Sequence, residues 1–193
     1  MENFGKIIVL SIIQGVAEFL PISSSGHLVL AKHWMGLTSP GATLEVVLHA
    51  GTLISVLVYY RKRISGLLAD FLRGPGEGRL YAAYVVLASI PAGLVYFLAG
   101  DRIEALFDSS RGACVALILN GFILLSLLRF PRVERPLGGR ISLLVGIAQA
   151  VALVPGISRS GSTTVVGRHL GLSPARAAEF SLLMSVPVVA GAM

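Results

Sequence analysis

The chain has 193 residues, of which 54% are hydrophobic and only 13% are charged, and its mean hydropathy is +0.80. Because a soluble domain carries about 25% charged residues, this composition predicts an integral membrane protein and excludes an ordinary soluble domain. The net charge of +6 is divided among short segments, which argues against a nucleic-acid-binding face and is typical of membrane topology signals. The single cysteine, Cys114, excludes an intrachain disulfide.

The first apolar stretch, Ile7–Leu20, is too short to cross a bilayer as one helix, since a span takes about 20 residues. It ends at Pro21 and a Ser-Ser-Ser-Gly cluster, and a second short stretch, Leu28–Leu37, follows. Such a pair predicts a re-entrant helical hairpin whose irregular tip lines a cavity or is buried in protein. The alternative is one long helix that is kinked at the proline. We favour the hairpin because Pro, Gly and Ser cluster at its centre.

Three longer apolar stretches come next and predict membrane spans: Thr43–Tyr60, Leu80–Gly100 and Gly112–Leu128. The segments between them differ in charge, since residues 61–79 and 129–140 form basic loops whereas residues 101–111 carry both signs. The positive-inside rule places the two basic loops in the cytoplasm and the mixed loop outside.

The last quarter of the chain follows the same pattern as the first. Ile141–Val154 ends at Pro155-Gly156 and is followed by Thr163–Leu172, which predicts a second re-entrant hairpin. A fourth span is expected to begin near Arg176 and to continue to Met193.

The two hairpin sequences are copies of each other. Between residues 12–37 and 147–172, at a constant offset of 135, ten of 26 positions are identical. A hairpin returns to its starting side and three spans follow the first copy, so the second copy starts on the opposite side. We therefore expect an all-α polytopic membrane protein built from inverted repeats. Residues 1–193 form one membrane domain, with repeat one at 1–135 and a truncated repeat two at 136–193 that is expected to lack two C-terminal spans.

The first tip carries an acid, a histidine and hydroxyl groups. Gln14 and Glu18 are four residues apart on one face of a helix. A carboxylate at membrane depth is costly, so Glu18 is a functional candidate. The alternative is a structural carboxylate that only accepts hydrogen bonds from the backbone or a neighbouring hydroxyl. His27 can serve as an acid, a base or a nucleophile toward phosphorus, or only as a structural hydrogen-bonding residue. The hydroxyl groups belong to Ser23, Ser24 and Ser25.

The second tip, from Pro155 to Thr164, has the composition of a phosphate cradle. Arg159 supplies a planar, permanent cation, and hydroxyls and backbone amides at a helix N-terminus bind the remaining phosphate oxygens. The hydroxyls belong to Ser158, Ser160, Ser162 and Thr163. The alternative is that Arg159 only neutralises Glu18.

Other charged residues are assigned no role in the site. Glu45, Glu179 and His49 are left outside it, with the two glutamates expected to hold the repeats together or to cap spans. Interfacial snorkelling explains a second group: Lys32, His33, Arg168 and His169.

The two motifs, QGVAEFLPISSSGH at 14–27 and PGISRSGST at 155–163, resemble those of the undecaprenyl-diphosphatase family, the bacitracin-resistance membrane phosphatases. The first family motif is Glu or Gln, three residues and then Glu, and Gln14 and Glu18 fill it in its less acidic variant. The family arginine falls on Arg159, the histidine on His27 and a reactive serine on Ser24. The resemblance implies hydrolysis of a C55 isoprenyl diphosphate at the outer face of the bacterial cytoplasmic (inner) membrane, which regenerates a lipid carrier for cell-wall synthesis. It also implies a divalent cation, Mg²⁺ or Ca²⁺, with Glu18 as a ligand.

The mechanism expected from these residues places the diphosphate between the two tips, with Arg159 and its neighbouring hydroxyls orienting it. Glu18 acts as the base or holds the cation, and Ser24, a water molecule or His27 attacks the phosphorus. Two other functions remain open: a transporter for a lipid phosphate or small anion, and an inactive truncated paralogue. The expected partners are an isoprenyl diphosphate and membrane lipids but no nucleic acid, and a homodimer is left open.

Overall fold

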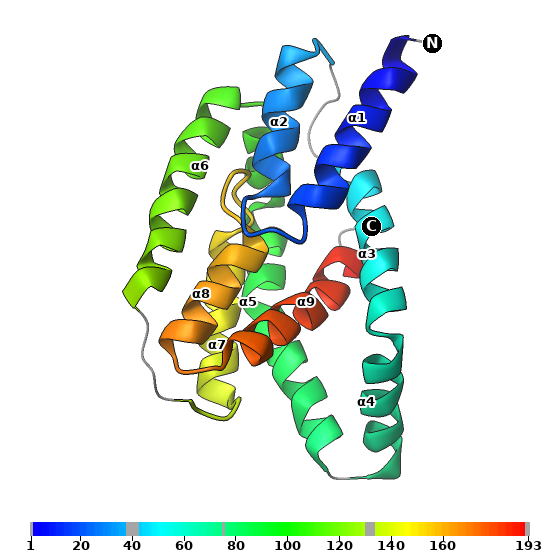
Figure 1. Cartoon of the computed structure of the whole chain (residues 1–193), viewed down its shortest axis with the longest axis vertical. Helices are drawn as coiled ribbons and strands as arrows, with labels where there is room; N and C mark the ends of the chain where they lie inside the picture. The colour runs from blue at the N-terminus through cyan, green and yellow to red at the C-terminus, as the bar shows by residue number, and fades with distance from the viewer. Residues whose placement is uncertain (1, 38–42, 75, 130–133, 192–193) are drawn as a thin grey trace.

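The computed structural model describes residues 2–37, 43–74, 76–129 and 134–191, and these ranges are helical without any strand (Figure 1). The all-α prediction is therefore confirmed. The helices are α1 (Glu2–Ala17), α2 (Ser24–Trp34), α3 (Thr43–Tyr59), α4 (Arg61–Arg73), α5 (Glu77–Leu106), α6 (Ser110–Leu125), the 3₁₀ turn η1 (Ser126–Arg129), α7 (Gly139–Val151), α8 (Arg159–His169) and α9 (Pro174–Gly191).

Helices α1 and α2 form the first re-entrant hairpin. Pro21 lies in the turn between them, and the Ser23 side chain caps α2 by accepting a hydrogen bond from the Gly26 amide at 3.3 Å. Leu10 of α1 and Leu28 of α2 are fully buried in the small core that joins the two helices. The alternative prediction, a single Pro-kinked helix, is therefore wrong.

Helices α7 and α8 form the second hairpin, and its tip uses the same cap. The Ser158 hydroxyl accepts a hydrogen bond from the Gly161 amide at 3.0 Å. Gly156 has a φ of 108°, a backbone conformation that favours glycine. Figure 1 shows the first hairpin entering from the upper end of the molecule and the second from the lower end, so that their tips meet near the middle. The predicted inverted arrangement of the repeats is confirmed.

The predicted spans correspond to helices, with two differences. Helix α5 and the continuous α6–η1 helix are each long and apolar enough to cross a membrane. Helices α3 and α4 make a third span only if the two, which meet at a bend of 71°, are counted as one broken span. The prediction of a loop over residues 61–79 was wrong, because α4 occupies Arg61–Arg73. The fourth expected span coincides with α9, which does not count as a spanning helix within the described residues. Its expected end, Met193, lies outside them.

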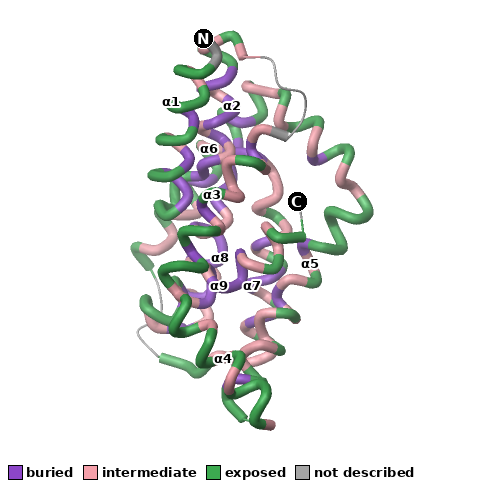
Figure 2. Tube along the Cα trace, turned by 90° about the vertical axis from the view of Figure 1, so that its right-hand side faces the viewer, coloured by how far each residue is buried: buried purple, intermediate pink, exposed green. Residues whose placement is uncertain are grey.

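The charged connections group at the ends of the molecule as the loop charges predict. In Figure 1 the basic helix α4 and the start of α7 lie at the lower end, whereas the α5–α6 connection lies at the upper end, as the N-terminus does. Most of the large exposed side chains of α1, α5 and α6 are apolar. Figure 2 shows these outer faces exposed and the buried residues gathered along the inner helices, which is the pattern of a protein surrounded by lipid.

Close packing between α5 and α7 supports the second hairpin. Gly146 of α7 lies against the backbone of Ala88 of α5, and Val145, Phe180 and Met184 pack around this contact in the largest buried cluster. A small residue allows the two helix backbones to approach, which is the usual source of helix association in a membrane.

We expect Gly146→Ala to lower the free energy of unfolding by about 2 kcal/mol, because the added Cβ would lie 2.9 Å from the Ala88 Cα. Gly121→Ala on α6 is the control, since a Cβ there meets no atom within 4 Å, and its effect should stay within about 1 kcal/mol. Unfolding of the purified proteins in detergent measures both. Equal stability of the two variants would contradict the packing described here.

Candidate active site

Glu18 lies in the turn after α1 and is the centre of a hydrogen-bond network at the first tip. Its side chain is 9% exposed. Oε1 pairs with the guanidinium of Arg159 from the second tip. Oε2 accepts hydrogen bonds from the Ser24 hydroxyl at 2.6 Å and the Gln14 amide at 3.1 Å, and faces His49 Nε2 at 3.2 Å. The structure therefore brings four predicted site residues together, around a carboxylate whose two oxygens are both occupied.

His49 of α3 belongs to this network, although the sequence analysis left it out. Its Nδ1 lies 2.6 Å from the backbone carbonyl of Glu45. Because carbonyl and carboxylate oxygens accept hydrogen bonds, Nδ1 and Nε2 both carry protons, so His49 is an imidazolium that donates to the Glu45 carbonyl and to Glu18. The signal that could have identified His49 was an ionisable side chain within a predicted span.

Arg159 is the first residue of α8, and the cap formed by Ser158 positions it. One guanidinium nitrogen pairs with Glu18, while Nη1 is buried and has no hydrogen-bond partner among the residues that the structure describes. A half-buried guanidinium with an unused donor beside a helix N-terminus is well suited to bind a phosphate oxygen.

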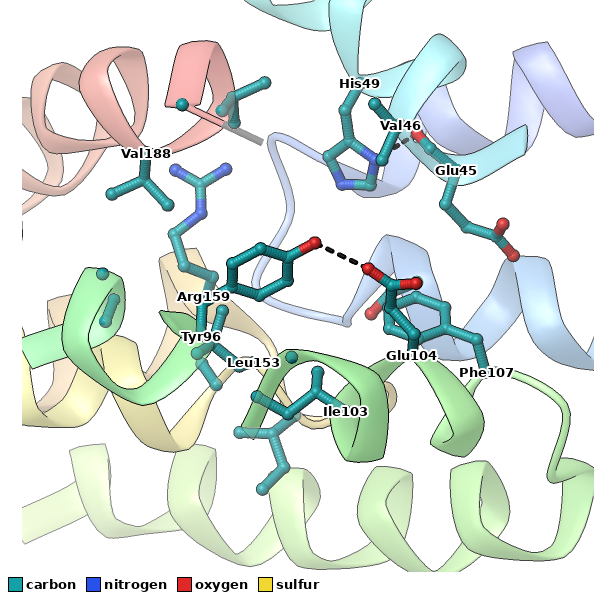
Figure 3. Close-up of a pocket in the computed structure, with 18 of the residues that line it drawn as sticks. Glu45, Val46, His49, Tyr96, Ile103, Glu104, Phe107, Leu153, Arg159 and Val188 are labelled. Carbon is teal, nitrogen blue, oxygen red and sulfur yellow. Dashed lines mark hydrogen bonds between the residues drawn. The ribbon is translucent and has the colours of Figure 1, made fainter. Parts of the chain in front are cut away.

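The two tips open onto a cavity of about 960 Å³. Figure 3 shows Arg159 and His49 on opposite sides of the same space, with Tyr96 and Glu104 of α5 below it. The Tyr96 hydroxyl donates to Glu104 at 2.6 Å. The apolar part of the wall comes from α5 and α9 and includes Phe97, Leu98, Pro187, Val188 and Val189. The cavity thus joins a charged end to an apolar end.

The structure divides the predicted site residues into two groups. Those that line the cavity are Glu18, Ser23, Ser24, Ser25, Ser158, Arg159 and Ser160. Gln14 does not line it but bonds to Glu18. The other three, His27, Ser162 and Thr163, do not line the cavity.

The three residues outside the cavity have other surroundings. His27 Nδ1 lies 2.7 Å from the Ser23 carbonyl, so its ring contacts the backbone of the tip. Thr163 donates to the Arg159 carbonyl at 2.7 Å and lies 2.6 Å from the Ser181 hydroxyl of α9. The Ser162 hydroxyl is buried without a hydrogen-bond partner in the described residues. His27 and Thr163 therefore hold the backbone of the tips and do not face the cavity.

The snorkelling explanation was wrong for two of the four residues to which it was applied. Lys32 is buried and forms an ion pair with Glu45 at 2.6 Å, with side chains that are 6% and 2% exposed. Arg168 is buried and donates to the Leu172 carbonyl. Lys32 and Glu45 are 13 positions apart and belong to different helices, so neither residue reveals its partner in the sequence.

The two glutamates that were expected to hold the repeats together or to cap spans behave differently. Glu179 of α9 pairs with Arg63 of α4 at 2.8 Å, and this pair joins repeat two to repeat one as expected. Glu45 instead pairs within repeat one, to Lys32, and also lines the cavity.

One oxygen atom beside Glu18 is left for a hard divalent cation, since both carboxylate oxygens already have partners. Gln14 Oε1 is buried and has no hydrogen-bond partner in the described part of the chain, although its Nε2 donates to Glu18. Mg²⁺ is commonly held by one or two carboxylates together with substrate phosphates. Among the described residues no group of three or more His, Cys, Asp or Glu could hold a metal ion. A cation at Glu18 and Gln14 would therefore take its remaining ligands from substrate or water.

Two opposed re-entrant hairpins that place a carboxylate, a hydroxyl and an arginine at membrane depth define a membrane protein that acts on a phosphorylated ligand. The family model described as "Bacitracin resistance protein BacA" matches residues 7–193. The chain belongs to this family.

Curated relatives named undecaprenyl-diphosphatase are similar along nearly the whole chain. The protein from Colwellia psychrerythraea is 40% identical, over 96% of this chain and 74% of its own length. Those from Pelotomaculum thermopropionicum and Moorella thermoacetica are each 42% identical, over 97% of this chain and 72% and 73% of their own lengths.

We expect Lys32→Met to lower the free energy of unfolding by about 3 kcal/mol, because it leaves the Glu45 carboxylate buried without its cation. The control is Lys62→Met on α4, where the lysine is exposed and the change should stay within about 0.5 kcal/mol. Chemical unfolding in detergent distinguishes the two, and a Lys32→Met protein as stable as the Lys62→Met protein would show that the ion pair is unimportant.

Proposed function

We propose that this chain hydrolyses undecaprenyl diphosphate to undecaprenyl phosphate and inorganic phosphate. The observation that supports this most is the contact of Glu18 with both Ser24 and Arg159 at the charged end of a cavity. A carboxylate within 2.6 Å of a hydroxyl is the arrangement of a base and its nucleophile. Membership of a family whose relatives are named for this hydrolysis agrees with that chemistry.

Substrate binding follows from the two ends of the cavity. The diphosphate takes the charged end, where the free Nη1 of Arg159 and the amides at the start of α8 neutralise and orient its oxygens. The isoprenyl chain lies along the apolar wall formed by α5 and α9. As the phosphates engage Arg159, the guanidinium binds Glu18 less strongly, so the carboxylate becomes a better base.

In the first chemical step, Ser24 Oγ attacks the terminal phosphorus and its proton passes to Glu18 Oε2. The bond from that phosphorus to the bridging oxygen breaks, and undecaprenyl phosphate leaves with the electron pair. Glu18 returns the proton to the leaving phosphate oxygen, so the carboxylate is restored. Arg159 stabilises the charge that develops on the phosphate oxygens.

In the second step, a water molecule attacks the phosphoserine. Glu18 removes a proton from the water and delivers it to Ser24 Oγ as the phosphorus–oxygen bond breaks, which releases inorganic phosphate. In the alternative role of Glu18, it would instead hold a Mg²⁺ or Ca²⁺ ion together with Gln14, and the ion would neutralise negative charge on the phosphate oxygens.

Ser24 is favoured over His27 as the nucleophile because Ser24 touches the base, whereas His27 contacts the backbone of Ser23. Direct attack by water remains the competing route. A transporter for a lipid phosphate and an inactive paralogue are not favoured, because a carboxylate beside the anion site serves hydrolysis and would repel an anionic cargo.

The membrane in question is the bacterial inner membrane, and the first hairpin opens toward its outer face. Basic helix α4 and the start of α7 share one end of the molecule, which the positive-inside rule assigns to the cytoplasm. The first hairpin enters from the other end. The substrate is therefore taken from the outer leaflet, where the carrier lipid is released after cell-wall synthesis. A homodimer stays an open expectation.

We expect Glu18→Gln, Arg159→Ala and Ser24→Ala each to lower kcat/KM for phosphate release by at least about 100-fold, because each removes a group that acts on the transferred phosphoryl group. The measurement is inorganic phosphate released from undecaprenyl diphosphate by the purified protein in detergent. Ser162→Ala is the control, since that hydroxyl lies outside the cavity, and its turnover should stay within about threefold of the unaltered chain.

Acid quenching during turnover should trap a phosphoryl group on Ser24. Turnover within a few-fold of the unaltered chain in all three site variants would exclude the proposed site. A phosphoryl group found on His27 would exclude Ser24 as the nucleophile.

We expect His49→Leu to lower kcat about tenfold, because a hydrogen bond to a charged group contributes about 1.5 kcal/mol and the Leu side chain makes none with Glu18. His49→Gln keeps an N–H donor in the same place and should retain most of the activity. Steady-state kinetics of the two variants decide the question, and equal losses would mean that His49 does not act through its bond to Glu18.

A further inference from the structure

Asn120 connects the two hairpin tips to each other. It lies in α6, which is apolar enough to cross a membrane, and its side chain is only 3% exposed. Its Nδ2 donates to the carbonyl of Pro21 at 3.2 Å, and its Oδ1 accepts from the backbone amide of Ser158 at 2.9 Å. One side chain thus bonds to the backbone of both tips.

The orientation of this amide follows from its partners. A carbonyl only accepts and a backbone N–H only donates, so the side-chain nitrogen must face Pro21 and the oxygen must face Ser158. Both partners are backbone groups whose roles as acceptor and donor are fixed. The Asn120 side chain can therefore make both hydrogen bonds only when the two tips lie side by side.

Both bonds lie close to reacting groups. Pro21 is three residues before Ser24 and three after Glu18, and Ser158 directly precedes Arg159. The Ser158 amide is at the start of α8, so its bond to Asn120 holds the position from which the Arg159 side chain extends.

Glycine contacts bring the same three segments together. A Cβ on Gly26 of the first tip would lie 2.7 Å from the Gly156 Cα of the second tip. A Cβ on Gly156 would lie 2.7 Å from the Ala113 carbonyl of α6. Both tips therefore rest on α6 with no space for adjustment, and Asn120 is the side chain of α6 that bonds to both.

We propose that Asn120 is a positioning residue that holds Arg159 opposite Glu18 and Ser24 for the transfer of the phosphoryl group. The claim rests on the proposed function. A displacement of a reacting group by about 1 Å costs up to about 100-fold in rate. The two hydrogen bonds of Asn120, called the bridge below, should therefore affect kcat more than KM.

The test compares Asn120→Leu, which has a similar volume and no polar atoms, with Ser126→Ala. Ser126 is the matched control because it lies at the end of the same continuous helix and also bonds to α8. Its hydroxyl lies 3.0 Å from His169 Nε2, at the end of α8 that is remote from the tip. We expect Asn120→Leu to lower kcat at least about tenfold with KM within about threefold, and Ser126→Ala to leave both within about twofold. Equal kinetics of the two variants would overturn the proposal.

A double-mutant cycle shows whether Asn120 acts through Arg159. If it does, Asn120→Leu costs much less in an Arg159→Lys background than in the unaltered chain. Additive losses would mean that Asn120 acts elsewhere. Should Asn120→Leu fail to fold, Asn120→Ala is scored by the same criteria.

Hydrogen exchange tests the bridge without relying on turnover. Exchange at the tip segments 19–25 and 154–160 should be at least about tenfold faster in the Asn120 variant and unchanged in Ser126→Ala. Unchanged exchange in both variants would overturn the role of Asn120, whether or not the unaltered chain releases phosphate. A lack of phosphate release by the unaltered chain would reject only the proposed function.

Discussion

The contact between Glu18 and Arg159 is the constraint on which the rest of this structure depends. A carboxylate and a guanidinium at membrane depth each lose several kcal/mol of hydration, and neither is tolerated there without a partner. Because the two residues lie on tips that enter from opposite ends of the molecule, the pair forms only when both hairpins reach the middle. The same contact thus stabilises two charges and assembles a site from two halves of the chain.

Re-entrant hairpins create a second requirement, since each exposes unpaired backbone groups at its tip. The chain meets it in the same way twice, with a serine cap at Ser23 and another at Ser158. Ser23 adopts a φ of 66°, which is uncommon for a residue with a side chain, and His27 bonds to its carbonyl. The polar residues of the tips therefore divide between those that hold the backbone and those that face the cavity.

The sequence predicted the hairpins and their inverted arrangement because the duplication is visible in it and because proline, glycine and serine interrupt both copies. It also predicted Glu18 and Arg159, since charged groups in apolar segments are conspicuous, whereas the reactive role of Ser24 came from the resemblance to a family. The bend after α3 was missed because α4 begins directly at the basic residues, which looked like a loop. Composition alone does not distinguish a basic loop from a basic amphipathic helix.

The remaining site residues are defined by pairings that a sequence does not display. Lys32 looked interfacial because its buried partner, Glu45, comes from another helix. Nothing in the sequence separates Ser160, which lines the cavity, from Ser162, which does not, because a helix turns by about 100° per residue and only the direction of α8 decides. Asn120 stood out neither by charge nor by motif.

The most direct test of this account is the coupling between Glu18 and Arg159 in the free energy of unfolding. Glu18→Gln, Arg159→Gln and the double variant are unfolded in detergent beside the unaltered chain. If the two tips share one ion pair, the double variant should lose at least about 1 kcal/mol less than the sum of the two single losses. Losses that add to within experimental error would mean that the two residues do not meet, and the site described here would not exist.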